Sequence, residues 1–195
     1  MKQITTTVYS FSELSQEAQE KAIEKLYDIN VDENFWSDCV IDDAKECGKL
    51  LGITVDKVYF SGFSSQGDGA CFEGSYSYLK GSVKKIKSYA PKDIELHRIA
   101  SALSAVQKNH NYKLEASVKH SGHYYHSRCT DIDITKGFDY PDENTQDEMS
   151  ELLMDFMNWI YSQLEKQYEY LTSKEAIIET IQANDYGFDE DGNIV

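Results

Sequence analysis

The sequence lacks the features that mark several large classes of protein. Its 195 residues include only 2 Pro, and no apolar run approaches the roughly 18–20 residues that cross a bilayer. Residues 1–6 do not have the apolar core of a secretory signal. We therefore expect no membrane partner and a cytoplasmic location.

Cysteines are few and are not arranged in pairs. The 4 cysteines, at positions 39, 47, 71 and 129, form no CxxC motif. Without a secretory signal the default compartment is reducing, so we expect free thiols that are mostly buried. No cofactor-binding signature is present either, and we expect no cofactor.

Basic residues are scarce overall but concentrated in the middle of the chain. The sequence has 19 Lys and Arg against 34 Asp and Glu, a net charge of −15. Such a charge repels a nucleic-acid backbone, so we expect no direct nucleic-acid binding. Residues 80–128 nevertheless carry 10 basic against 3 acidic residues. This basic segment is suited to contact with an acidic partner or a phosphate.

Hydrophobic residues are plentiful enough for a folded core. They make up 41% of the chain, and aromatic residues make up 12%, which argues against disorder. Apolar residues at three- and four-residue spacing predict helices, and alternating or β-branched runs predict strands. The predicted helices span about 15–28, 33–51, 91–108, 145–170 and 174–183, and the predicted strands span 4–9, 53–63, 70–78, 114–119 and 124–134.

This order of elements predicts an α+β fold. Strands that cluster in two hairpins and alternate with long helices form an antiparallel sheet packed by about four to five helices, including a long amphipathic helix near the C-terminus. Residues 80–90 are interpreted as a basic connector. We expect one domain over residues 1–185 and an acidic tail over 186–195. The apolar stripe at 145–170 is wide, which is compatible with a homo-oligomer that covers part of it.

The turn of the first hairpin is one candidate site. Gly67 and Gly69 flank Asp68 and supply the positive φ angles of a tight turn. The loop could form a nest of N–H groups for an anion, or present Gln66 and Asp68 to a ligand or partner. The glycines could equally serve the turn alone. No Walker or Rossmann motif is present.

The second hairpin carries a cluster of imidazole, phenol, guanidinium and thiol groups over residues 120–129. These groups suit a phosphate or an aromatic ring, and protonation of several histidines near pH 6 would make the hairpin acid-sensitive. Zinc binding is disfavoured, because residues three apart on a strand face opposite sides; a loop could still gather these side chains, but we expect no metal. The candidate binding residues of the two hairpins are Tyr59, Ser61, Phe63, Gln66, Asp68, His123, Tyr125, His126 and Arg128.

Several strings resemble a known group of proteins. They are Val58–Gly74, which contains Phe60-Ser61-Gly62-Phe63 and Ser65-Gln66-Gly67-Asp68-Gly69-Ala70, the opening Tyr9–Ser15, and the closing strings Tyr170–Ala176 and Ala183–Gly192. Together they resemble an uncharacterised family of accessory proteins encoded by phages and prophages, sometimes labelled antitoxin-like. The resemblance implies a small protein made inside an infected bacterium, where such proteins often inhibit host defences or host enzymes, as anti-CRISPR proteins do.

Three functions follow as hypotheses. The first is a non-enzymatic protein that binds and inhibits a host protein, such as an anti-phage defence protein. The second is a small-molecule or nucleotide-binding protein, either a sponge or a small hydrolase, with its site between the two hairpins. The third is an antitoxin-like neutraliser of a basic toxin. No catalytic signature surrounds the cysteines or the acidic pairs, so we expect no enzyme activity.

Overall fold

The computed structural model describes residues 7–33 and 35–195. Its chain divides into two compact units, one built from residues 1–38 and 166–195 and the other from residues 39–165. The expected single domain over 1–185 stays a prediction. In chain order the elements are β1 (Tyr9–Ser10), η1 (Phe11–Glu13), α1 (Gln16–Lys25), α2 (Phe35–Leu51), β2 (Ile53–Phe60), β3 (Ala70–Ser77), α3 (Ser82–Tyr89), α4 (Ile94–Asn109), β4 (Leu114–His120), β5 (Thr130–Lys136), α5 (Glu143–Leu171), α6 (Lys174–Ala183) and β6 (Gly187–Phe188).

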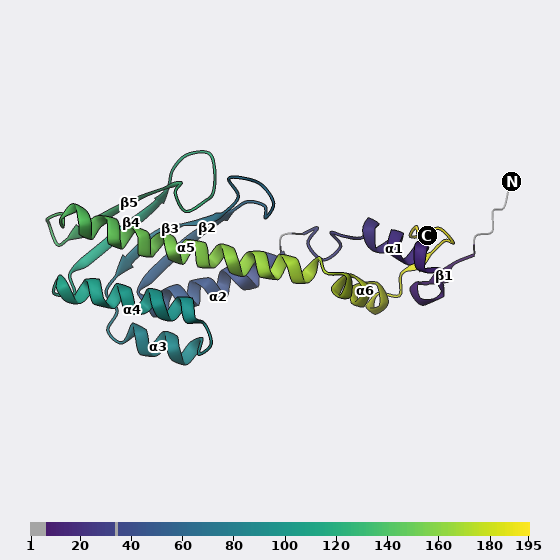
Figure 1. Ribbon diagram of the computed structural model, residues 1–195, viewed down its shortest axis with the longest axis horizontal. Coiled ribbons are helices and arrows are strands. Elements are labelled where there is room, and N and C mark those ends of the chain that lie inside the picture. The colour runs from purple at the N-terminus through teal and green to yellow at the C-terminus, as the bar shows by residue number, and fades with distance from the viewer. Residues whose placement is uncertain (1–6, 34) are drawn as a thin grey trace. The chain divides into compact units, whose positions relative to one another are not determined.

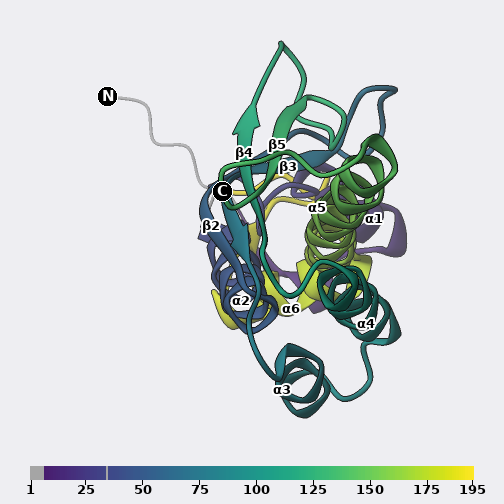
Figure 2. The same cartoon turned by 90° about the vertical axis from the view of Figure 1, so that its left-hand side faces the viewer.

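The larger unit is a four-stranded antiparallel sheet with helices on one face (Figures 1 and 2). The strand order is β2-β3-β4-β5, so each hairpin contributes two neighbouring strands. This confirms the predicted α+β class and the two-hairpin sheet, and α5 is the predicted long helix near the C-terminus.

Alternation along the strands explains why only one face is covered. Leu114, Ala116 and Val118 of β4 are buried, whereas Glu115 and Lys119 between and beside them are exposed. A period of two places the apolar set on the helix side and leaves the polar set on the open face. The ring of Phe72 on β3 meets Phe156 of α5 edge to face, with centroids 5.9 Å apart, at the centre of this core.

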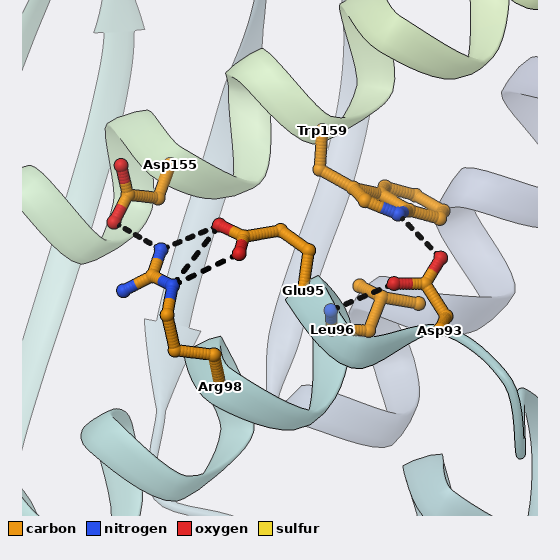
Figure 3. A network of polar contacts seen from close by, with 6 residues as sticks. All are labelled: Asp93, Glu95, Leu96, Arg98, Asp155 and Trp159. Atoms are coloured by element: carbon orange, nitrogen blue, oxygen red, sulfur yellow. Dashed lines mark hydrogen bonds and ion pairs between the residues drawn. The ribbon is translucent and has the colours of Figure 1, made fainter.

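A polar network joins α4 to α5 (Figure 3). Asp93 is the N-cap of α4 and accepts a hydrogen bond from the backbone N–H of Leu96 at 2.9 Å. Its other carboxylate oxygen accepts from the indole N–H of buried Trp159 at 2.8 Å. Arg98 bonds Glu95 one turn away on α4. It also bonds Asp155 of α5 at 2.5 Å.

The smaller unit is organised around one apolar cluster. Serine caps begin both of its short helices, because Ser15 accepts from Ala18 N–H and Ser173 accepts from Ala176 N–H. β1 pairs with β6, and Phe188 of that pair is fully buried. Part of the expected acidic tail is therefore built into this unit. The core consists of Phe11, Leu14, Ala18, Ala22, Ile177, Ile181 and Phe188.

Three details of the predicted elements differ from the structure. Residues 82–89, interpreted as a connector, form α3, because Ile86 is one turn from Ser82 and both are buried. The predicted strand at 124–134 begins only at Thr130, and residues 121–129 form a loop. The strand predicted at 4–9 falls partly on residues 4–6, which lie outside the described residues, and β1 occupies Tyr9–Ser10.

One connection holds an unusual backbone. Asn111 and Tyr112, between α4 and β4, both have positive φ angles, of 57° and 61°. The buried side chain of Gln107 lies beside them and bonds both backbone groups of Leu114, at 2.7 and 3.2 Å. This amide fixes the chain where it leaves α4 and enters the sheet.

Candidate functional site

The two hairpin loops, residues 61–69 and 121–129, lie at the same end of the sheet and touch each other. We call this surface the hairpin tips. β2 and β4, the strands that lead into the two loops, run in the same direction in this antiparallel sheet. Both loops therefore lie at the same end of it (Figure 1). Gly69 of the first loop lies against His126 of the second, so closely that a Cβ atom on Gly69 would be 2.6 Å from the His126 Cβ. Residues far apart in the sequence thus form one surface.

The sheet opens between the hairpins and makes room for this contact. β3 pairs with β4 only from Gly74 to Ser77, while β2 pairs with β3 up to Ala70 and β4 pairs with β5 up to His120. Glu73 stands where the pairing of β3 and β4 ends. One of its oxygens accepts from the backbone N–H of His120 at 3.3 Å, and the other accepts from the Tyr59 hydroxyl at 3.0 Å.

Aromatic and imidazole rings fill this opening. The ring of Tyr59 stacks on His120, with centroids 4.7 Å apart, and on Tyr125 at 5.6 Å. The ammonium group of Lys57 lies 4.2 Å from the centre of the same Tyr59 ring. Tyr59 is therefore enclosed by neighbours, and its hydroxyl is already bonded to Glu73. It acts as the centre of a packed cluster.

The polar groups of the first loop are bonded within that loop. Asp68 accepts from the backbone N–H groups of Ser65 and Ser64 at 2.7 and 3.0 Å. These bonds, with a smaller contribution from the Ser61 side chain, hold the pKa of the Asp68 carboxyl below its ordinary 3.8. Asp68 thus stabilises the turn. Of the two glycines predicted to have positive φ angles, Gly67 has one, of 104°, whereas Gly69 does not, so the prediction for Gly69 was wrong. Gln66, at the outermost part of the loop, is exposed.

Phe63 faces a different neighbour. Its ring stacks on Tyr161 of α5, with centroids 5.4 Å apart, and the Tyr161 hydroxyl donates to the carbonyl of Gly62 at 3.0 Å. This pair attaches the first loop to α5. We predicted Phe63 as a binding residue, but its ring is engaged with the helix side of the loop.

The second loop brings a thiol and an imidazole together. The Cys129 sulfur is 3.4 Å from His126 Nε2, and the Cys129 N–H donates to the His126 carbonyl at 2.8 Å. We expected alternating strand geometry to separate these side chains, and this was wrong, because residues 121–129 form a loop. The described residues contain no group of three or more His, Cys, Asp or Glu side chains able to hold a metal ion.

The outer side of this loop is exposed. His123, Tyr124 and Arg128 are exposed, and Tyr124 has 58% of its surface accessible. Tyr124 also stands over Gly67 of the first loop, with ring carbons 3.7 and 3.8 Å from where a Cβ atom would lie. The exposed Gln66, His123, Tyr124 and Arg128 are therefore the groups that a partner would meet first.

The candidate binding residues named from the sequence omit four residues of this surface: Gly69 as a contact, Glu73, and His120 and Tyr124, which belong to the predicted cluster over residues 120–129. Gly69, Glu73 and His120 act across the opening between the hairpins, and local patterns do not show which residues face one another there. Tyr124 was predicted to lie in a strand over 124–134, where successive side chains point to alternate faces of the sheet. The available signal was the density of rings in residues 120–126.

The chain belongs to a family described as a domain of unknown function, DUF8835, whose model matches residues 36–174. This match includes both hairpins and therefore the hairpin tips. No curated protein and no solved structure gives a significant match. None of the helices in the described residues is both long and apolar enough to cross a membrane.

Proposed function

We propose that this chain is a non-enzymatic binding protein that uses the hairpin tips to hold a partner protein. The observation that carries the proposal is the direct contact of Gly69 with His126, which joins two distant loops into one surface. Exposed tyrosine and arginine side chains at such a surface are the residue types that contribute most to protein–protein binding.

The internal bonding of the cluster favours this function over a small-molecule site. A pocket requires polar groups that point into a cavity and are free to meet a ligand. Here the Tyr59 hydroxyl is bonded to Glu73, and Asp68 is bonded to its own loop. Residues predicted to line a pocket instead support the exposed groups above them.

The finer form of the proposal concerns the partner. From the resemblance of the sequence to phage and prophage accessory proteins, we infer that the partner is a protein of the bacterial host, such as an anti-phage defence protein, and that this chain blocks it. The exposed Arg128 at the tips supports a partner with an acidic contact surface, because opposite charges speed and select association.

Affinity capture tests this proposal. The tagged chain is incubated with bacterial lysate at physiological salt, and bound proteins are identified and quantified by mass spectrometry. We expect one stoichiometric partner that is lost with the triple variant Gln66→Ala, Tyr124→Ala, Arg128→Ala, since all three residues are exposed at the tips.

A matched control lies elsewhere on the same unit. Tyr112, Phe138 and Tyr140 are also exposed, on the loops that precede β4 and follow β5. The triple alanine variant of these residues should keep the partner. Loss of the partner with the control and not with the tip variant would assign binding to the other end of the sheet, and capture of no stoichiometric partner would contradict the proposal.

A further inference from the structure

The two outer strands of the four-stranded sheet differ in regularity. β2 forms one edge and β5 the other. The pairing of β2 shifts between Val55 and Lys57, which marks a bulge, and bulges protect sheet edges from further pairing. β5 pairs with β4 without a shift from Lys136 to Thr130. The β5 edge is therefore regular, and it is open from Thr130 to Thr135, since Lys136 at its end already bonds both of its backbone groups to Asp139.

A hollow runs beside this regular edge. It has a volume of about 430 Å³ and is lined by Thr130, Asp131, Ile132 and Asp133 of β5, by Ser150 and Met154 of α5, and by Arg128. Consecutive residues of a strand point to opposite faces, so a hollow that touches four of them in a row lies alongside the strand. There is thus space next to the edge of β5.

We propose that an extended segment of a partner protein binds in this hollow by adding a strand to the edge of β5. In a regular strand every second residue directs its N–H and C=O groups away from the neighbouring strand. On an edge strand these groups are open to a peptide backbone, and strand addition is a common mode of peptide recognition.

The side chains beside the edge define the chemistry of the segment. Asp131 and Asp133 are exposed on the open face, while Ile132 is half-buried on the helix side beside Met154. Directly paired residues share a face. The segment therefore places basic residues opposite the two aspartates and an apolar residue opposite Ile132, in a basic–apolar–basic order.

The same side chains exclude a second copy of β5 as the occupant. Antiparallel pairing of two β5 strands would set aspartates against aspartates, and like charges directly opposite one another destabilise a sheet. Basic residues of a partner segment would instead attract the two aspartates. The charges therefore favour a basic partner segment over a second copy of β5. The edge proposal does not depend on the hairpin tips binding a partner.

A labelled heptapeptide of alternating Lys and Val tests the proposal on the full-length chain. Fluorescence anisotropy should show saturable binding, and ¹⁵N chemical-shift changes should be concentrated in residues 130–134 and in α5 around Ser150 and Met154. Two control peptides carry N-methyl groups on alternate amides, one set on each side of the strand. Only one of the two should bind, because strand pairing uses the amides of one side.

A charge exchange provides the second measurement. The variant Asp131→Lys, Asp133→Lys should bind the Lys-Val peptide about 2- to 30-fold more weakly and should bind a Glu-Val peptide better than the wild type does, because two surface ion pairs are reversed. The control variant Asp42→Lys, Glu46→Lys changes two exposed acids on α2, which does not line the hollow, and should bind the Lys-Val peptide within about two-fold of the wild type.

Three results would overturn the proposal: absence of saturable binding, equal binding of both methylated peptides, or equal weakening by the control variant. The last two would show general attraction to an acidic protein. The alanine variant of Gln66, Tyr124 and Arg128 separates this proposal from the function of the tips. It should lose the partner captured from lysate yet bind the peptide within about three-fold of the wild type, because only Arg128 reaches the hollow.

Discussion

Gly69 and His126 pack so tightly across the two hairpins that no side chain larger than hydrogen fits at position 69. A Cβ atom there would lie 2.6 Å from the His126 Cβ and 2.7 Å from its Cα. Backbone and Cβ atoms cannot rotate away as the end of a long side chain can. The glycine thus joins the hairpins, and its dihedral freedom is not the reason for its presence.

The substitution Gly69→Ala should therefore separate the tips. We expect a loss of about 1–3 kcal/mol in the free energy of unfolding, as for other overpacked sites, and weaker capture of the tip-bound partner. Urea unfolding followed by tyrosine fluorescence measures the first effect. Gly62→Ala is the control in the same loop, since its nearest contact would be the Asp68 carboxylate at 3.2 Å. Equal losses for the two variants would argue against the contact.

Asp93 should be among the most sensitive polar residues of the larger unit. The variant Asp93→Ala removes both the cap of α4 and the acceptor for the buried indole of Trp159 (Figure 3). Loss of a cap costs about 1 kcal/mol, and an unpaired buried donor costs about 1–3 kcal/mol. We expect a total loss of about 2–4 kcal/mol in chemical unfolding.

A double-mutant cycle isolates the indole bond. Trp159→Phe removes the N–H donor but keeps an aromatic ring beside Phe156. In this background Asp93→Ala should cost only the cap, about 1 kcal/mol. A coupling energy near zero would mean that the Asp93–Trp159 hydrogen bond does not stabilise the fold.

Acid should weaken the first hairpin loop through Asp68. Its folded-state pKa is lowered from 3.8 by the N–H groups of Ser65 and Ser64. A carboxyl with a lowered pKa stabilises the fold above its unfolded pKa, and this contribution disappears as the pH falls through the folded pKa. The free-energy difference between the wild type and Asp68→Asn should be largest above about pH 4 and should shrink below it. A pH-independent difference would contradict this assignment.

The four cysteines should react at different rates. Burial is the main cause that raises the pKa of the Cys47 and Cys71 thiols to about 12, and both are at most 1% exposed. Cys39 is exposed and Cys129 is half-buried. Thiolates are the reactive species, so iodoacetamide at pH 8 should modify Cys39 and then Cys129, and the other two only after denaturation. Mass spectrometry of tryptic peptides gives the order, and early labelling of Cys71 would contradict the packing of β3.

The sequence predicted the elements whose signals are local. The turn residues around Asp68 predicted the first hairpin, and the helix predicted over 174–183 is α6 with its observed bounds. α3 was missed because it has only eight residues and two buried positions, too few for a clear period. The length of the loop at 121–129 was also missed, since its two tyrosines have high strand propensity.

The candidate site was predicted in part. The sequence identified both loops, but it could not show that Phe63 packs on Tyr161 or that Tyr59 is enclosed by His120 and Tyr125. These are contacts between segments distant in the chain. They depend on how far β3 and β4 stay paired, which no single strand encodes.

The bulge in β2 makes the two edges of the sheet unequal as templates for a further strand. With one edge irregular and the other regular, the sheet can receive a strand at β5 but offers no second site where the addition can repeat. The strand addition proposed at β5 would therefore have no counterpart at β2. A protein built in this way can capture an extended segment without nucleating linear polymers.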